Sequence, residues 1–221
     1  MQDFELIDIS IPITSKTACF PGDTPFSKET TGALSKGNCF NLTKLTMSPH
    51  VGTHADAPVH IIGDLGGDDN TAGSLPLKPF IGPCLVLNLA PTHDEITIDQ
   101  VQGILEKMAK FPERILFKTA NNLRHEIFEE TYAYFSTELV KYLASRGVKL
   151  IGIDTPSVDH IDSKNLSAHH ELIESQMSWL ENLDLSNASE GYYFLVAAPL
   201  KFMELEASPV RAVLIKHFGS Y

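Results

Sequence analysis

The chain has 221 residues, 43% hydrophobic and 20% charged, a composition typical of one soluble globular domain over residues 1–221. Its formal net charge of −11 argues against a nucleic-acid partner and against an anionic membrane surface. No secretory signal, no apolar run of the ~20 residues that span a membrane and no paired cysteine motif are visible, so we expect a cytoplasmic protein.

The first half of the chain is predicted to contain mostly strands. Residues 6–11 and 41–47 alternate apolar and polar side chains, which predicts half-buried strands, and the apolar run 84–89 predicts a third strand. Thr97 and Gln100 resemble a capping box, in which the two side chains bind the first backbone N–H groups of a helix. Apolar residues at helical spacing follow, so we expect a helix after Thr97.

The second half is predicted to mix strands and helices. Residues 136–146 have a helical pattern that ends at Gly147, and residues 167 to about 180 are a second candidate helix. Apolar runs predict strands at 115–117, 148–153, 192–198 and 209–215. The helices are few and do not alternate strictly with strands. We therefore expect an α/β or α+β fold, with a mixed, curled or barrel-like sheet flanked by a few helices.

The stretch from His50 to His60 carries three histidines and one aspartate within eleven residues. Imidazole and carboxylate are the ligands that zinc and similar transition metals prefer. Isolated surface histidines are the alternative interpretation, but four such residues beside glycine and proline favour a metal site. Structural zinc sites are usually closed and rich in cysteine, whereas N and O ligands leave room for water, which favours a catalytic site.

The backbone of this stretch must bend to form one site. Positions 50, 54, 56 and 60 share one face of an extended chain, but eleven extended residues would span ~33 Å, too far for one ion. The glycine and the proline inside the stretch can provide the bends. We predict that His50, His54 and Asp56 bind one ion and that His60 stays unbound beside it as a general acid/base.

A second group of histidines and acidic residues lies later in the chain, at Asp159, His160, His169, His170, Glu171, Glu174 and Glu181. These residue types are also common on exposed helices, so the residues alone leave a ligand set and a solvated face as alternatives. His93, His125 and His217 are isolated, and no role is assigned to them.

The pattern His-x-Gly-Thr-His-x-Asp-x-Pro-x-His resembles the signature of the cyclase family, which includes bacterial kynurenine formamidases. The resemblance extends over nearly the whole chain, through the segments at 20–26, 75–77, 81–83, 154–159, 168–170 and 207–211. It implies a centre with two Zn²⁺ ions per subunit, although Mn²⁺ and Fe²⁺ accept the same ligands. The matching metal ligands are His50, His54 and Asp56 for one ion, with Asp56 as the bridge, and His169 and Glu181 for the other.

The resemblance also implies the reaction. N-formyl-L-kynurenine, an aryl formamide of tryptophan degradation, would be hydrolysed to L-kynurenine and formate by metal-bound hydroxide, with His60 as the acid/base. Phe20 stands where many family members carry tryptophan and is expected to line the pocket for the aryl group, and His160 stands where proline is common. A homodimer is implied as well. The alternatives are a related hydrolase of a cyclic amide such as isatin, and a metal-dependent small-molecule binding protein without turnover.

Overall fold

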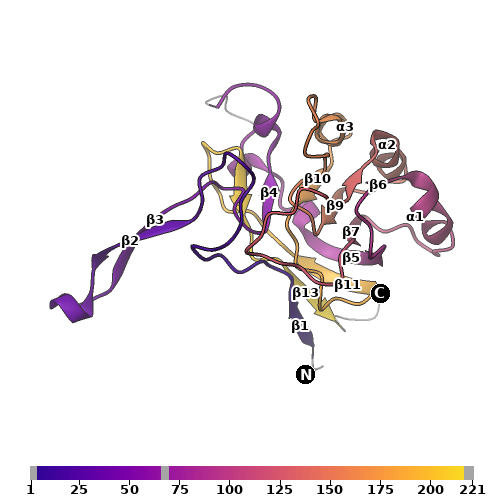
Figure 1. Ribbon diagram of the computed structural model, residues 1–221. Coiled ribbons are helices and arrows are strands. Elements are labelled where there is room, and N and C mark those ends of the chain that lie inside the picture. Colours follow the sequence, from indigo (N-terminus) through magenta and orange to yellow (C-terminus); the bar gives the residue numbers. More distant parts are fainter. Residues whose placement is uncertain (1–3, 66–69, 217–221) are drawn as a thin grey trace.

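A seven-stranded sheet forms the centre of the computed structural model, which describes residues 4–65 and 70–216 (Figure 1). In spatial order its strands are β1 (Glu5–Asp8), β13 (Val213–Lys216), β11 (Gly191–Val196), β5 (Ile81–Asn88), β7 (Arg114–Lys118), β9 (Leu150–Ile153) and β10 (Ser178–Leu180). In this spatial order, β1, β13, β11 and β5 pair antiparallel with their neighbours. The strands β5, β7, β9 and β10 pair parallel. The prediction of a mixed sheet is confirmed.

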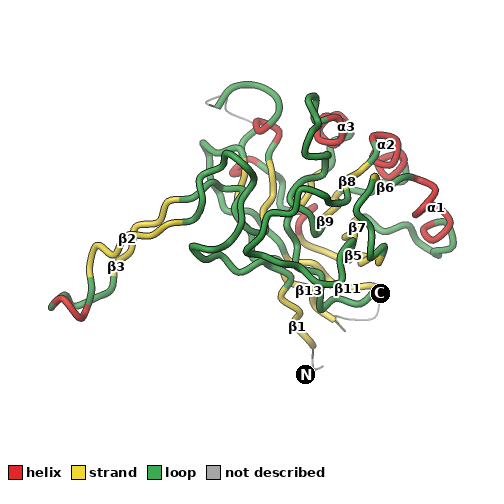
Figure 2. The backbone as a smooth tube through the Cα atoms, in the orientation of Figure 1, coloured by secondary structure: helices red, strands yellow, loops and turns green. Residues whose placement is uncertain are grey.

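The helices connect the parallel strands. They are α1 (Ile98–Leu105), α2 (Thr137–Ser145) and α3 (Ser167–Glu174), which follow β5, β7 and β9 respectively. Figure 2 shows that they gather at one side of the sheet and that long loops fill the other side. Apolar side chains of all three helices join one buried core with strand residues such as Leu85, Phe117 and Ile151. Helices cover one face of the parallel strands and a second apolar core covers the other, which explains why these strands are almost wholly apolar.

The sheet curls so that its two edges meet at one end. Ser10, just after β1, forms an isolated bridge with Leu183, which lies just after β10. The carbonyl of Ile9 accepts a hydrogen bond from the backbone N–H of Asp184 at 2.9 Å. The predicted curl is therefore confirmed. A second core packs inside it, with residues such as Ile9 and Leu183.

Shorter elements complete the described part of the chain. The strands pair as β2 (Ser27–Gly32) with β3 (Leu42–Thr46), β4 (His54–Asp56) with β12 (Ala207–Pro209), and β6 (Glu95–Ile96) with β8 (Tyr134–Phe135). The 3-10 turns are η1 (Leu34–Lys36), η2 (Pro58–His60), η3 (Ala72–Ser74) and η4 (Lys78–Phe80). None of the described helices combines the length and the apolar character that a membrane crossing needs.

The hairpin arm, residues 27–46, projects away from the body of the protein (Figure 1). The prediction of a strand over 41–47 is confirmed as β3, but the prediction that it is half-buried is wrong, because both of its faces are exposed. Alternation in β3 places leucines on an uncovered surface rather than on the core. A two-stranded hairpin by itself is only marginally stable in water.

The predicted helix from 167 to about 180 is correct only in its first half. Helix α3 ends at Glu174, and Gln176 adopts a left-handed φ of 53°, which breaks the helical path. Strand β10 then runs parallel to β9, with all three of its residues buried. The predicted strand at 209–215 is likewise divided between β12 and β13. In both places the pairing with distant strands overrides the local pattern.

Helix α2 starts at a capped N-terminus, which leads to a stability prediction. The hydroxyl oxygen of Ser136 accepts a hydrogen bond from the backbone N–H of Leu139 at 3.1 Å. Ser136→Ala removes this bond and should lower the free energy of unfolding by ~0.5–2 kcal/mol in urea denaturation. Ser145→Ala, at the exposed end of the same helix, is the matched control and should change it by less than ~0.5 kcal/mol. Equal stability of Ser136→Ala and the wild type would contradict this role.

Candidate metal centre

The short strand β4 is the base of the candidate site. His54 and Asp56 are two residues apart on β4, so both side chains point to the same face. Glu181 is positioned by the backbone of the same strand: its N–H donates to the carbonyl of His54 at 3.1 Å, and its carbonyl accepts from the N–H of His54 at 3.2 Å. Residues far apart in the chain thus become direct neighbours.

The predicted bends are present on both sides of β4. Gly52 has a left-handed φ of 76°, and a Cβ atom there would lie 2.8 Å from the side chain of Ile13. Only glycine fits at this position without strain. Pro58 opens the turn η2, which carries His60 at its end. The chain therefore turns His50 and His60 back toward the strand between them.

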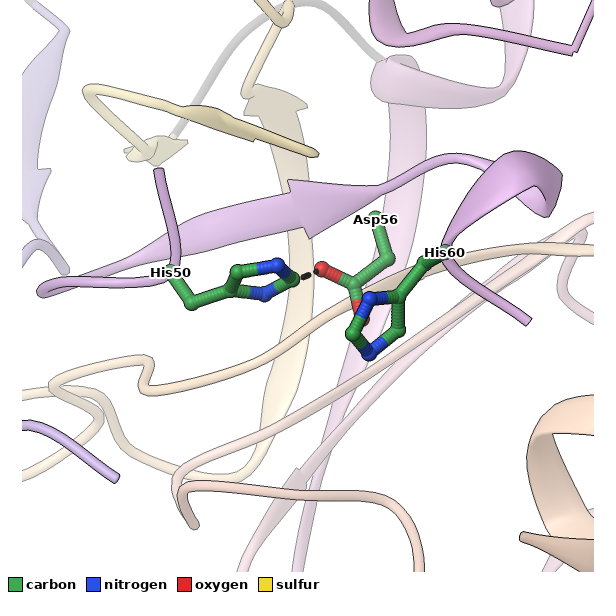
Figure 3. Close-up of side chains that lie close together, drawn as sticks. All are labelled: His50, Asp56 and His60. Atoms are coloured by element: carbon green, nitrogen blue, oxygen red, sulfur yellow. Dashed lines mark ion pairs between the residues drawn. The ribbon is translucent and has the colours of Figure 1, made fainter. Parts of the chain in front are cut away.

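The carboxylate of Asp56 lies at the centre of the cluster. Its Oδ1 atom is 3.0 Å from Nδ1 of His50 and 3.3 Å from Nε2 of His54. Its Oδ2 atom faces the other way and is 3.6 Å from Nε2 of His169, which α3 supplies. Figure 3 shows His50 and His60, which precede and follow β4, both beside this carboxylate, and their ring centroids are 4.5 Å apart. The two oxygens of Asp56 thus face two different groups of imidazoles.

Glu181 repeats this arrangement. Its Oε2 atom is 3.2 Å from Nε2 of His54, and its Oε1 atom is 3.5 Å from Nε2 of His169. Both carboxylates are almost completely buried. Two buried carboxylates at such short range need positive charge between them, because burial of an uncompensated charge is costly.

Three of the four histidines are held from outside by an acceptor. Nδ1 of His54 lies 2.9 Å from the carbonyl oxygen of Gly52, and Nδ1 of His169 lies 2.7 Å from Oδ2 of Asp159. Nε2 of His50 is 3.6 Å from Oε1 of Glu206. Each of these rings turns its other nitrogen inward. Such outer contacts fix the tautomer and orientation of histidines that bind metals.

His60 differs from the other histidines of the cluster. Within the described residues its ring nitrogens have no hydrogen-bond partner, and its ring centroid lies 4.5 Å from that of His50. The residue is exposed. Desolvation by the surrounding cluster nevertheless lowers the pKa of His60, so its imidazole is neutral at pH 7.

The pKa values of the buried groups are set by burial and by mutual charge. Burial disfavours the charged form of His54, but the carboxylates of Asp56 and Glu181 outweigh it and raise the pKa of His54 to about 10. Burial also opposes ionisation of Asp56, yet His50 and His54 hold the pKa of Asp56 well below its usual range. Protons on the imidazoles therefore balance the carboxylates. A divalent cation that binds here replaces those protons.

The donor atoms fit a divalent metal. Nε2 of His54 and Oδ1 of Asp56 are buried without a hydrogen-bond partner and face each other. Two ligands of a tetrahedral zinc ion, each ~2.0–2.2 Å from it, lie roughly 3.3 Å apart, which matches the inward distances in this cluster. Among the described residues, two groups have ligand atoms that all lie within 4.8 Å of one another. They are His54–Asp56–Glu181 and His50–Asp56–His60, and they share Asp56.

The comparisons with known proteins agree with this geometry. A family model described as "Putative cyclase" matches residues 7–160. The chain belongs to the cyclase family. Over 209 residues it is 41% identical to "Kynurenine formamidase" of Bordetella avium (strain 197N), covering 95% of this chain and 97% of that protein. "Kynurenine formamidase" of Bordetella pertussis (strain Tohama I / ATCC BAA-589 / NCTC 13251) is 38% identical over 209 residues, which again cover 95% of this chain and 97% of that protein.

Solved structures show the same fold. One described as "The Structure Of Potential Metal-Dependent Hydrolase With Cyclase Activity" has a TM-score of 0.82 at 26% identity, covering 98% of this chain and 100% of that one. Another, "Isatin hydrolase A (IHA) from Labrenzia aggregata bound to benzyl benzoate", has a TM-score of 0.83 at 22% identity, covering 96% and 93%. This cyclase-family chain is a hydrolase, and its cluster of His, Asp and Glu side chains is a candidate metal-binding group.

Other residues that the sequence of this cyclase-family protein singled out lie elsewhere. Phe20 packs edge-to-face on Phe128, with 5.3 Å between ring centroids, in the wall of a separate cavity of about 130 Å³. That cavity reaches Gly52 but is lined by none of the candidate ligands. His160 and Glu174 are exposed and outside the cluster. His217 lies outside the described residues.

Three contacts of the site were not predicted from the sequence. Trp179 donates its indole N–H to Oδ2 of Asp56 at 3.2 Å and packs edge-to-face on His169. Asp159 and Glu206 are the outer carboxylates of His169 and His50. Asp159 was visible only as one acidic residue among several. Trp179 was placed in a helix by its local pattern, and Glu206 carried no signal.

Proposed function

We propose that this cyclase-family hydrolase converts N-formyl-L-kynurenine and water to L-kynurenine and formate. The relatives with the name kynurenine formamidase support this substrate. The observation that carries the proposal is the asymmetry of the histidines. His54 and His169 are each hydrogen-bonded to an outer acceptor and His50 lies 3.6 Å from Glu206, whereas the ring nitrogens of His60 have no hydrogen-bond partner among the described residues. A site built only to bind metal needs no such free imidazole.

We further propose two zinc ions per subunit, with Mn²⁺ as the alternative metal. His50, His54 and Asp56 would hold one ion, His169 and Glu181 would hold the other, and Asp56 would bridge them. The opposite orientations of the two Asp56 oxygens support this division. Zinc at such a site supplies a Lewis acid and lowers the pKa of bound water to ~7.

The chain's own residues handle the proton transfer. In the hydrolysis, the water oxygen forms a bond to the formyl carbon, and the bond from that carbon to the aniline nitrogen breaks. His60 accepts a proton from the attacking water and delivers it to the departing nitrogen. Its exposed position at the edge of the cluster lets it reach a substrate that enters from solvent. Phe20 would contribute to recognition of the aryl group; the cavity that it lines with Phe128 reaches Gly52, the glycine between His50 and His54.

An assay of the purified enzyme, reconstituted with zinc, tests the proposed substrate. Hydrolysis of N-formylkynurenine is followed by the release of formate and of the free aniline. We expect turnover of this substrate and little or none of isatin. Hydrolysis of isatin alone would favour the cyclic-amide alternative, and metal binding without hydrolysis of either compound would favour a binding protein.

We also propose that the protein is a homodimer, with the hairpin arm as part of the interface. Four large apolar side chains on the arm are more than half exposed in the single chain: Leu34 59%, Phe40 56%, Leu42 55% and Leu45 62%. The arm leads directly into Ser48 and His50, so a partner that covers it would also lie near the metal centre.

The three free cysteines support a reducing compartment such as the cytoplasm.

Leu45→Asp tests the role of the arm. Burial of one leucine side chain contributes ~1.5–3 kcal/mol, and a symmetric dimer buries two, so the dimer Kd should rise by about 10²-fold or more. Sedimentation velocity across a range of concentrations measures this change. Thr46→Asp, next to it on β3 and likewise exposed, is the matched control for one added negative charge. A monomeric wild type, or a dimer unaffected by Leu45→Asp, would contradict the arm as the interface.

A further inference from the structure

We propose that Asp159 is a positioning residue that holds His169 with its Nε2 atom toward the metal centre, an inference that rests on the proposed metal-dependent function. The carboxylate of Asp159 lies 2.7 Å from Nδ1 of His169, and both side chains are almost fully buried. At this distance an ionised carboxylate accepts the Nδ1–H proton in a short, charge-assisted hydrogen bond. The lone pair of Nε2 is then free to face Asp56 and Glu181.

The Asp159 carboxylate is itself fixed in place. Its two oxygens accept backbone N–H groups from the first turn of α3, Oδ1 from Ala168 and Oδ2 from His169, each at 3.0 Å. The backbone of Asp159 is also held, since its N–H donates to Ser157 and its carbonyl accepts from the hydroxyl of Tyr132. The carboxylate therefore connects the start of α3 to the ring of His169 and leaves that ring little freedom to rotate.

Val158, the residue before Asp159, contacts Glu181, the other candidate ligand of the same ion. The backbone N–H of Val158 donates to Oε1 of Glu181 at 2.8 Å. Two consecutive residues thus orient both His169 and Glu181, which come from α3 and from the end of β10. The next residue, His160, turns outward to Tyr134, with 5.1 Å between their ring centroids. The segment 158–159 acts as the frame for the second half of the centre.

A carboxylate that only caps α3 would make the same backbone contacts, so the test must separate the two roles. Asp159→Asn keeps the size and an acceptor oxygen but removes the charge that faces His169. We expect one metal ion per subunit to be held as in the wild type and the other to bind ~10–100-fold more weakly. Zinc competition with a chelator, together with metal analysis, measures both affinities without any assay of hydrolysis. Asp162→Asn, whose side chain is 85% exposed in the same segment, is the matched control and should bind as the wild type does.

A double-mutant cycle with His169→Gln shows whether Asp159 acts through His169. If it does, Asp159→Asn causes no further loss of zinc affinity once His169 is replaced. A second loss of the same size would overturn the proposal, because Asp159 would then act through the fold. Equal zinc affinities of Asp159→Asn and the wild type would overturn it as well.

A spectroscopic measurement on the wild type covers the case in which Asp159→Asn does not fold. The imidazole ¹H–¹⁵N spectrum of the zinc-loaded protein should show His169 protonated at Nδ1, with the resonance assigned by its absence in His169→Gln. Zinc bound through Nδ1 would overturn the inference. A wild type that binds a single ion contradicts the two-zinc proposal. The positioning role then requires that this ion bind through His169, and an unchanged affinity for it in Asp159→Asn would overturn the inference. A wild type that binds none contradicts both.

Discussion

Replacement of His60 by alanine should lower kcat for N-formylkynurenine by ~10²–10⁴-fold, the usual contribution of a general acid/base. His60 has no hydrogen-bond partner among the described residues and is exposed, so its removal disturbs little of the surrounding packing. We expect the zinc content, measured by metal analysis, and the thermal midpoint to stay at wild-type values. Steady-state kinetics then attribute the loss to the proton transfer.

Two controls make this result specific. His170→Ala removes an exposed histidine on α3 and should leave kcat unchanged. A substrate with a better leaving group than aniline should lose less activity in His60→Ala, because it depends less on protonation of the departing nitrogen. A wild-type rate in His60→Ala would remove His60 from the mechanism. Loss of zinc in this variant would instead make His60 a ligand, as its place in the His50–Asp56–His60 group allows.

Glu181→Ala is expected to release one of the two proposed zinc ions and to lower kcat/KM by more than about 10²-fold. Glu181 faces both His54 and His169, so its removal leaves two buried imidazoles without their shared carboxylate. The backbone N–H of Val158 loses its acceptor as well. Metal analysis after dialysis against a weak chelator measures the zinc stoichiometry, and kinetics with excess zinc show whether activity returns.

Glu181→Gln and Glu174→Ala are the controls for this prediction. The glutamine keeps the volume and can still accept from Val158, so a variant that folds normally but holds one zinc ion confirms that the charge of Glu181 binds metal. Glu174 is an exposed acidic residue at the end of α3, and its replacement should alter neither zinc content nor rate. Two zinc ions per subunit in both Glu181 variants would exclude Glu181 from the centre.

Local patterns predicted the parts of the fold that local forces determine. The capping box at Thr97 and the stop of α2 at Gly147, which has a φ of 88°, depend only on nearby backbone groups. Two predictions were partly wrong: the burial of β3 in the hairpin arm and the helical assignment of β10. In both cases distant contacts set the environment of the segment. Nothing near Leu45 shows that its strand leaves the body, and nothing near Trp179 shows that β9 lies beside it.

In the metal centre, too, local patterns predicted some residues and distant contacts determined the others. The spacing of His50, His54 and Asp56 predicted their convergence, because a single glycine-containing bend brings them together. From the residues alone, Glu181 could not be distinguished from the exposed Glu174. Its selection depends on the backbone pairing with His54, which only the folded sheet supplies. Contacts such as the one from Asp159 to His169 are likewise consequences of how α3 docks on the sheet.

Trp179 gives this enzyme an intrinsic optical probe at its centre. It is the single tryptophan of the chain, its indole N–H binds Oδ2 of Asp56, and its ring packs on His169. Selectively excited indole emission of the unlabelled protein therefore originates in contact with both halves of the centre. Entry of a cation, which changes the charge around Asp56, can be timed by stopped-flow fluorescence without a dye, a second fluorophore or turnover of substrate.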